Sequence, residues 1–412
     1  MASHRLFTLP VAILVFQSFL LGTSEFIIVG VLPDIASDLN IAVTMVGNLV
    51  AIFAFVYAPL TPIGAAICSK FQRFRALIAL LLVFLAGNVI CTFAVNYPML
   101  LLARVVTASV SGVLVAVALT FGPDVTSREN QPRYMSWVFS GFSIASVFGM
   151  PMGTWIAGLA GWRTSFVVID VLTVVMIGVM FVVLPKRSVP SQVGILGQFK
   201  LFSDRRIILG VLTVVFGLAS SYVWYTYLTP MFTNELHVPA AYVSVALVAF
   251  GACCLWSNLY SGKLATRGTG IWPLVGMRKA YALQFVCMLL LPFATANAML
   301  GSVLLVVLGL TIYLQNSPSQ VLYSYVAETG YPGCGTLASS LNSTSCNLGI
   351  ALGSAVGGVA YDAAGLRWLG PVGAVFAALA VLMTVLLKVN DGWRAMRSVS
   401  YTHLRAHETA AN

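Results

Sequence analysis

The chain has 412 residues, of which 59% are apolar and only 8% are charged, whereas roughly a quarter of the residues of a soluble globular domain are charged. This composition excludes a soluble globular protein and indicates an integral membrane protein. The formal net charge of +10 does not indicate nucleic-acid binding, because no basic patch with interleaved aromatic residues occurs and basic helix ends suit membrane topology. We therefore expect membrane lipid as a partner and no nucleic acid.

The first apolar run extends from Leu9 to Leu32 and contains a single carboxylate, Glu25. A helix of this length spans a bilayer at about 1.5 Å per residue. The run is too long for a signal peptide and no A-x-A site follows it, so we expect it to remain as the first span. An acid within a span costs roughly 2.5–3.5 kcal/mol on insertion scales and usually faces a polar cavity or a partner. Glu25 is therefore the first candidate functional residue.

Short polar breaks divide the chain into twelve apolar runs, which predicts an all-α membrane protein with twelve transmembrane helices. Of the 22 lysines and arginines, 19 fall in alternate loops on one side, and the positive-inside rule places these loops and both termini in the cytoplasm. The predicted spans cover residues 9–31, 42–65, 75–94, 98–122, 134–158, 164–185, 207–231, 240–262, 274–294, 298–320, 334–360 and 367–388.

Two pairs of short segments indicate an internal duplication at an offset of about 200 residues. Ala160 to Arg163 opens the sixth span and Ala364 to Arg367 the twelfth, and similar basic segments follow the second and eighth spans. Such repeats are typical of transporters with a midplane site between two halves. We predict two pseudo-symmetric six-helix bundles, at residues 1–186 and 207–390. A cytoplasmic linker, residues 187–206, joins them, and a tail follows at residues 391–412.

The fifth span contains small residues at four-residue spacing, Gly141, Ala145, Gly149 and Gly153, which permit close helix approach. Pro151 is expected to bend this helix. The segment GFSIASVFGMPMG is similar to the antiporter motif of the major facilitator superfamily, and residues 5–390 resemble its twelve-span drug:proton antiporter branch, which includes bacterial sugar-efflux and chloramphenicol-efflux transporters. The resemblance implies a tight, leak-resistant contact between the halves at this motif. Direct contact with cargo is the alternative.

The loop after the second span resembles part of the family's gating motif, G-x-L-x-D-R-x-G-R-R. Ser69 stands where the motif has its acid, and Thr266 replaces the acid in the second copy. Two alternatives therefore stay open, a charge-relay latch and basic residues retained for topology alone. The candidate gating residues are Lys70, Arg73, Arg75 and Arg267.

Two further ionisable residues lie within spans. Arg104 matches the arginine of the family's R-x-x-x-G motif, with Ala108 in place of the glycine, and a guanidinium stays charged at any relevant pH. We predict that Arg104 tunes the proton affinity of Glu25, and the alternative is that it bonds backbone carbonyls of neighbouring helices. Asp170 in the sixth span matches no family signature; it either carries a proton or is hydrated near the outer interface.

Aromatic and amide side chains within the spans are candidates for contact with cargo. Tyrosine offers an apolar face and a hydroxyl group, which suits drugs or sugars. Each candidate also has a structural alternative, because aromatic residues gather at membrane interfaces and amides tie helices together. The candidates are Asn48, Tyr57, Tyr222, Tyr225, Trp256, Asn258, Gln315 and Asn342.

The sequence has no G-x-x-x-x-G-K-[ST] nucleotide-binding loop and no soluble domain that could hold a catalytic site, so neither direct ATP drive nor enzyme activity is expected. An ion gradient remains as the energy source. We predict a monomeric transporter of the bacterial cytoplasmic membrane that exports a sugar or drug-like compound in exchange for protons, with no cofactor, metal or catalytic residue. The alternatives are a facilitator or proton symporter that imports a small polar nutrient, and a non-transporting membrane sensor or membrane-embedded enzyme.

The segment SVSYTHLRAHET, from Ser398 to Thr409, differs from the rest of the chain in being polar and aperiodic. It resembles a translated sequencing adapter, so residues from about 398 onward are candidates for a non-native end. Its two histidines and the seven scattered cysteines show no metal-ligand spacing.

Overall fold

The computed structural model describes residues 8–68, 70–127, 130–186, 196–268, 270–294, 298–331 and 334–410. Over these residues the protein is all-helical, with no β-strand. Eleven helical segments among them are long and apolar enough to cross a membrane. Helix α17 (Gly335–Ala364) covers the remaining predicted span. Ser69 and residues 187–195 of the predicted linker lie outside the described residues.

The first half of the chain, which we call the N-terminal half, comprises the elements up to residue 183. Two of them are short, and the fifth predicted span is divided by a π-helix, η2. In order they are α1 (Leu9–Gly30), α2 (Leu32–Asp38), α3 (Val43–Cys68), α4 (Arg73–Thr92), α5 (Tyr97–Leu119), α6 (Gly122–Val125), α7 (Gln131–Ile144), η2 (Ala145–Gly149), α8 (Met150–Ala160) and α9 (Trp162–Val183).

The C-terminal half comprises the elements from residue 196 onward. The tenth predicted span is interrupted between α15 and α16, and α18 extends into the predicted tail. In order they are the 3₁₀-helix η3 (Leu196–Ser203), α10 (Arg205–Tyr225), α11 (Leu228–Pro230), the π-helix η4 (Met231–Glu235), α12 (Ala240–Ala265), α13 (Trp272–Gly276), α14 (Arg278–Ala294), α15 (Ala298–Thr311), α16 (Asn316–Gly330), α17, the 3₁₀-helix η5 (Leu366–Trp368) and α18 (Leu369–Ala410).

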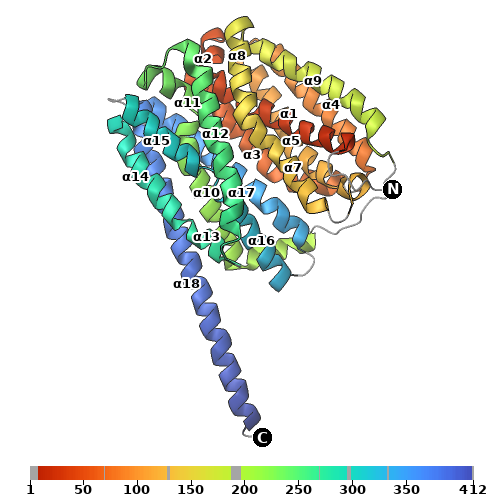
Figure 1. The fold of residues 1–412 in the computed structure, drawn as a ribbon, viewed down its shortest axis with the longest axis vertical. Coiled ribbons are helices and arrows are strands. Elements are labelled where there is room, and N and C mark those ends of the chain that lie inside the picture. Colours follow the sequence, from red (N-terminus) through yellow and green to blue (C-terminus); the bar gives the residue numbers. More distant parts are fainter. Residues whose placement is uncertain are drawn as a thin grey trace.

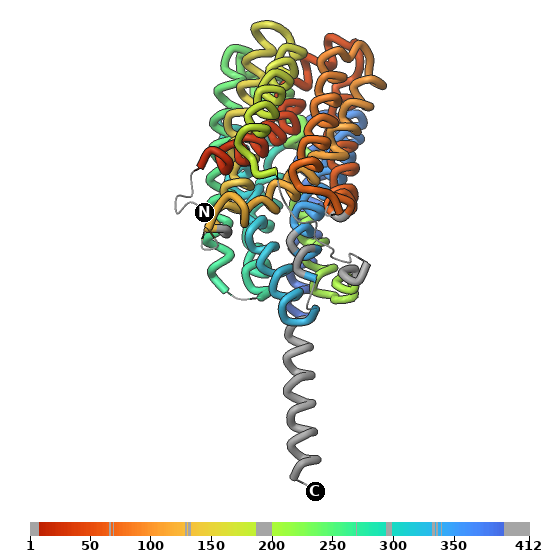
Figure 2. Tube along the Cα trace, turned by 90° about the vertical axis from the view of Figure 1, so that its right-hand side faces the viewer, coloured from red at the N-terminus to blue at the C-terminus, as the bar shows by residue number. Residues whose placement is uncertain are grey.

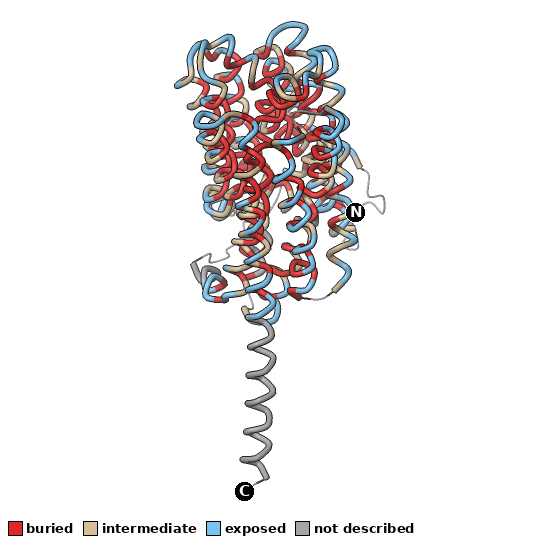
Figure 3. The backbone as a smooth tube through the Cα atoms, turned by 90° about the vertical axis from the view of Figure 1, so that its left-hand side faces the viewer, coloured by how far each residue is buried: buried red, intermediate tan, exposed pale blue. Residues whose placement is uncertain are grey.

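The helices of the two halves are inclined to one another, with α1, α4 and α9 running toward the lower right of Figure 1 and α12 and α14 toward the bottom (Figures 1 and 2). The halves meet where α3 packs on α17 and where α12 packs on η2 and α8. We call the side on which α9 ends and α10 begins the linker side, and the opposite one the far side. Buried residues follow the helix faces that meet inside, and exposed ones follow the outer faces (Figure 3).

The small residues of the fifth predicted span pack against α1 of the same half. A Cβ atom at Gly141 would lie 2.7 Å from the carbonyl oxygen of Val15, and Gly149 faces the side chain of Thr23. In an α-helix, positions four apart drift by about 40° around the axis. The wider turn of η2 counteracts this drift, because a π-helix bonds i to i+5 and takes more residues per turn. The small residues thus approach α1 of their own half closely, whereas the resemblance implied that they would face the other half.

The other half touches this span through different residues. A Cβ atom at Gly251 of α12 would lie 2.6 Å from the carbonyl oxygen of Ser146 and 2.8 Å from the Cα atom of Val147, both in η2. Pro151 lies directly after η2 in a helix that continues without a break from α7 into α8, and because it has no N–H it cannot donate to a carbonyl of the preceding turn. The departure from α-helical geometry therefore precedes Pro151.

The duplicated Ala-Gly-x-Arg segments adopt the same geometry in both halves. Gly161 has φ 84° and Gly365 has φ 84°, a region that residues with side chains rarely occupy. The arginine that follows each glycine forms an ion pair at the far side, Arg163 with Asp38 at 2.6 Å and Arg367 with Glu235 at 3.3 Å. Each pair connects the start of a sixth helix to the segment between the first two helices of its half.

Candidate functional site between the two halves

A cavity of ≈ 10 Å³ lies between the halves, which is room for about one water molecule. Both halves contribute to its wall, so any movement of one half against the other changes it. The lining residues are Glu25, Phe26, Val29, Val50, Phe53 and Arg104 from the N-terminal half and Tyr222 and Ile350 from the C-terminal half. Three candidates from the sequence, Glu25, Arg104 and Tyr222, therefore meet here.

Glu25 lies in a closely packed part of α1 and faces the cavity between the halves. On α1, Gly22 and Thr23 pack against Ala145 and Gly149, while the side chain of Glu25 is only partly buried and reaches the cavity. Among the described residues it forms no ion pair within the 4.0 Å limit. Its carboxylate is close enough to Arg104 for the two charges to interact, so Glu25 can accept or release a proton without breaking a direct salt bridge.

Arg104 is almost completely buried, with 1% of its surface exposed. Its Nη1 donates a hydrogen bond to the carbonyl oxygen of Ser24 at 2.9 Å, and the guanidinium lies 4.6 Å from the centroid of the Phe53 ring. Its Nε is buried with no hydrogen-bond partner among the described residues. Arg104 thus both bonds a carbonyl of α1 and holds a positive charge beside the cavity.

Asp170 lies apart from this cavity, between α9 and α4. Its Oδ2 accepts a hydrogen bond from the Thr92 hydroxyl at 2.8 Å, and its Oδ1 is buried with no partner among the described residues. The buried amide Asn88 lies one turn before Thr92 and accepts a 2.7 Å hydrogen bond from Ser24. Asp170 is therefore not among the residues that line the cavity with Glu25.

The two candidate tyrosines of α10 have different surroundings. The Tyr222 hydroxyl is 3.1 Å from the Tyr313 hydroxyl, and its ring reaches the cavity. Tyr225 packs behind it, 4.9 Å from the Tyr222 ring and 5.7 Å from the Phe250 ring, between centroids. Tyr57 is buried on α3, with its ring centroid 6.1 Å from that of Phe53.

Three asparagines of the C-terminal half form what we call the amide cluster: Asn258, Asn316 and Asn342. The Asn316 side-chain amide donates to Asn258 Oδ1 at 3.1 Å. The Cys346 thiol lies 3.8 Å from Asn316 Oδ1 and 3.7 Å from Asn342 Oδ1 and joins the two. Asn258 also donates across the interface to the Ser143 hydroxyl at 2.6 Å. Ser143 and Cys346 were not among the candidates from the sequence.

The remaining candidates lie away from this cluster. Gln315 is 2% exposed, accepts a hydrogen bond from Tyr281 and donates to the carbonyl oxygen of Val214 at 3.4 Å, so it ties three helices together. Trp256 is 49% exposed and stacks on Tyr260 at 4.9 Å. Asn48 lies at the far side next to Gly358.

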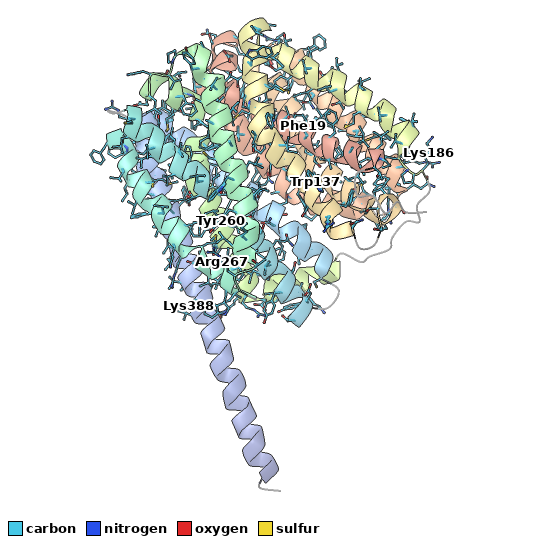
Figure 4. All side chains as sticks on the ribbon, viewed as in Figure 1. Phe19, Trp137, Lys186, Tyr260, Arg267 and Lys388 are labelled. Carbon is cyan, nitrogen blue, oxygen red and sulfur yellow. The ribbon has the colours of Figure 1, made fainter. Side chains whose placement is uncertain are left out.

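The gating-loop residues lie on the linker side. Arg73 forms a 2.7 Å ion pair with Asp124 of α6, so a carboxylate reaches this arginine from another loop. Arg267 donates to the Tyr260 hydroxyl at 3.1 Å, near the end of α12 (Figure 4). Lys70 and Arg75 are exposed.

At the far side the halves are joined by direct contacts. The Thr229 hydroxyl donates to the carbonyl oxygen of Val29 at 2.9 Å. The Tyr227 ring, buried in the break after α10, lies against Gly47 of α3. These contacts close the region above Glu25 toward the far side.

The sequence is similar to a known family of membrane transporters and to individual members of it. The sequence profile described as Major Facilitator Superfamily matches residues 14–337. The chain is 30% identical over 369 residues to the MFS-type transporter YtbD of Bacillus subtilis (strain 168), covering 89% of this chain and 92% of that protein. It is 30% identical over 376 residues to the inner membrane transport protein YdhP of Escherichia coli (strain K12), covering 91% and 94%.

Solved structures show the same fold at low sequence identity. A bacterial homologue of the human lysosomal transporter Spinster, in an inward-facing and unoccupied conformation, superposes with a TM-score of 0.72 at 15% identity. The match covers 92% of this chain and 96% of that one.

Proposed function

Because the chain belongs to the Major Facilitator Superfamily, a family of multi-pass membrane transporters and not of enzymes, we propose that it exports a small organic compound in exchange for protons. The observation that carries this proposal is the cavity between the halves, in which an acid without a direct ion pair, Glu25, lies beside the buried guanidinium of Arg104. An acid in this position can couple its protonation to the relative position of the halves.

We further propose twelve spans in two six-helix bundles, with the linker side and both termini in the cytoplasm of a bacterial cell. The eleven apolar helical segments together with α17 supply the spans. The loops assigned to the cytoplasm carry most of the basic residues, in line with the positive-inside rule. Assignment to the inner membrane draws on the similarity to YdhP, whose name describes an inner membrane transport protein.

In the proposed cycle, protonation and cargo binding favour different conformations of the protein and so oppose each other. Arg104 stays charged, so ionised Glu25 is stabilised by it and protonated Glu25 is not. Protonation from outside therefore favours one conformation, and cargo bound from the cytoplasm favours the other. The similarity of the Gly141–Gly153 segment to the antiporter motif supports export over import, and sugar and drug efflux are the activities that the resemblance suggests.

The proposal is tested with purified protein in liposomes under an imposed pH gradient. A pentose, uridine, chloramphenicol and tetraphenylphosphonium serve as probes, and the internal pH is followed as each is added to wild type and to Glu25→Gln. We expect at least one probe to move protons in the opposite direction through wild type and none through the variant. Proton movement in the same direction as cargo would instead establish a symporter, and cargo flux with no proton movement in wild type would refute proton coupling.

A further inference from the structure

Ionisable side chains are distributed unequally between the two halves. Within the N-terminal spans the sequence has Glu25, Arg104 and Asp170. The interiors of the C-terminal spans contain no Asp, Glu, Lys, Arg or His, namely residues 207–225, 240–262, 280–294, 298–327, 335–361 and 369–387. The polar groups that the C-terminal half presents inside the membrane are therefore amides, hydroxyls and thiols.

The amide cluster lies where a helix is interrupted inside its span. Helix α15 ends at Thr311 and α16 begins at Asn316, and the Tyr313 backbone N–H in the break donates to Ser257 Oγ at 3.0 Å. Irregular backbone at membrane depth is tolerated only where protein or a water-filled cavity surrounds it, and transporter sites are typically built at such broken helices. Asn258 and Asn316 remain partly exposed although each belongs to an apolar segment long enough to span a membrane, and Asn342 of α17 is partly exposed as well. The break and the exposure are independent indications of a ligand site.

This site is suited to uncharged groups. An amide both donates and accepts hydrogen bonds, and the neighbouring pair of Tyr222 and Tyr313 adds two hydroxyls and two aromatic faces. Among the described residues that line the cavity, a cationic cargo would find one carboxylate, Glu25, with the positive charge of Arg104 in the same wall. A buried charge without a partner is costly, so the site favours a cargo that carries no net charge.

We propose that the C-terminal half selects an uncharged cargo bearing several hydroxyl or amide groups, through the amide cluster and the Tyr222–Tyr313 pair. This inference rests on the proposed export function and adds the class of its substrate. Proton coupling then belongs to the N-terminal half and cargo recognition to the C-terminal half.

The hydrogen bond between Asn258 and Ser143 connects recognition to movement. It is short, at 2.6 Å, and it crosses between the halves. A cargo hydroxyl can accept the hydrogen bond of the Asn258 amide in place of the Ser143 hydroxyl. The bond between α12, which carries Asn258, and α7, which carries Ser143, is then lost. Cargo binding therefore loosens the halves at the place where α12 packs on the fifth predicted span.

The test uses the same liposomes and probes, with four further variants. In Asn258→Ala we expect transport of the uncharged probes to fall by about tenfold or more, with KM raised, because the lost amide leaves its partners unpaired. In Asn258→Asp we expect transport of tetraphenylphosphonium, and in wild type we expect none. Ser143→Ala should lower KM for the uncharged probes, because their competitor for Asn258 is gone. Asn234→Ala, at the exposed far side, is the matched control and should behave as wild type.

The inference is overturned if wild type transports tetraphenylphosphonium in preference to the uncharged probes, if it transports no uncharged probe, or if folded Asn258→Ala transports them as wild type does. Folding of each variant is checked by its thermal transition in detergent, and Asn258→Asp provides a gain of transport that a misfolded protein could not show. Glu25→Gln separates the two proposals. If an uncharged cargo crosses wild type without proton movement, proton coupling is refuted and the proposed cargo class stands. If a cationic cargo moves protons through wild type but not through Glu25→Gln, proton coupling stands and the proposed cargo class is refuted.

Discussion

Tyr227 of the C-terminal half lies so close to Gly47 of the N-terminal half that no side chain fits between them. A Cβ atom at Gly47 would be 2.7 Å from Tyr227 Cζ, and one at Gly358 of α17 would be 3.0 Å from the Tyr227 hydroxyl. The ring is thus held between two glycines from different halves, with its hydroxyl buried and unpaired among the described residues.

Gly47→Ala should separate the far-side ends of the two halves. The added methyl group would overlap the Tyr227 ring, whose backbone lies between α10 and α11 and cannot move without shifting both. Pulsed EPR between spin labels at the exposed positions Ser37 and Asn234 should show a longer distance in the variant. Gly178→Ala, which has open space around it, is the control, and an unchanged distance in a folded Gly47→Ala protein would contradict this assignment.

Gly141→Ala should destabilise the N-terminal half by about 1–3 kcal/mol through overpacking. Its Cβ atom would lie 2.7 Å from the Val15 carbonyl oxygen and 2.8 Å from the Phe19 nitrogen, and both are backbone atoms of α1. Thermal unfolding in detergent measures the loss. Gly158→Ala on the same span meets nothing within 4 Å, so it should be neutral or more stable, since alanine favours a helix by roughly 1 kcal/mol over glycine. Equal effects of the two changes would count against the packing described.

Arg104→Lys should uncouple export from protons although it conserves the charge. The planar guanidinium donates to the Ser24 carbonyl and lies over Phe53, and a lysine ammonium cannot reproduce both contacts. We expect proton-driven export to fall by about tenfold or more while exchange of labelled for unlabelled cargo continues. A lysine variant with wild-type proton coupling would show that charge alone is sufficient.

Gly161→Ala and Gly365→Ala should each cost about 1–3 kcal/mol of stability, because both positions require a backbone region that is nearly restricted to glycine. Nothing lies within 4 Å of a Cβ atom at either position, so the effect isolates backbone strain from packing. Gly262→Ala is an equally open position without positive φ and serves as the reference in thermal unfolding. A loss at one of the two glycines only would show that the halves are not equivalent here.

The proximity of Glu25 and Arg104 could be predicted because a charge in an apolar run is rare and strongly constrained. The sequence also predicted that Gly141, Gly149 and Gly153 share a helix face. It could not supply the partner of that face, since the rotation of one helix against another is set by packing across the whole bundle. The same limit applies to Asp170, whose hydrogen bond to Thr92 depends on the register of α4 and α9.

Neutral polar residues were harder to assign than charged ones. Asn258 and Gln315 look alike in the sequence, yet one reaches across the interface and the other ties helices of one half. Asp124 was missed because the gating motif directs attention to position 69, while the ion pair with Arg73 comes from a loop further along the chain. Spacing within one helix carries no information about such contacts.

The restriction of ionisable groups to the N-terminal spans determines where the transmembrane voltage acts. Each elementary charge that crosses the full field gains or loses about 2.3 kcal/mol per 100 mV, and an uncharged region experiences no such force. Protonation of Glu25 removes the negative charge beside Arg104 and so adds one positive charge to the field. The voltage therefore does its electrical work on the N-terminal half, and the C-terminal half follows mechanically through the contacts of α3 with α17 and of η2 and α8 with α12.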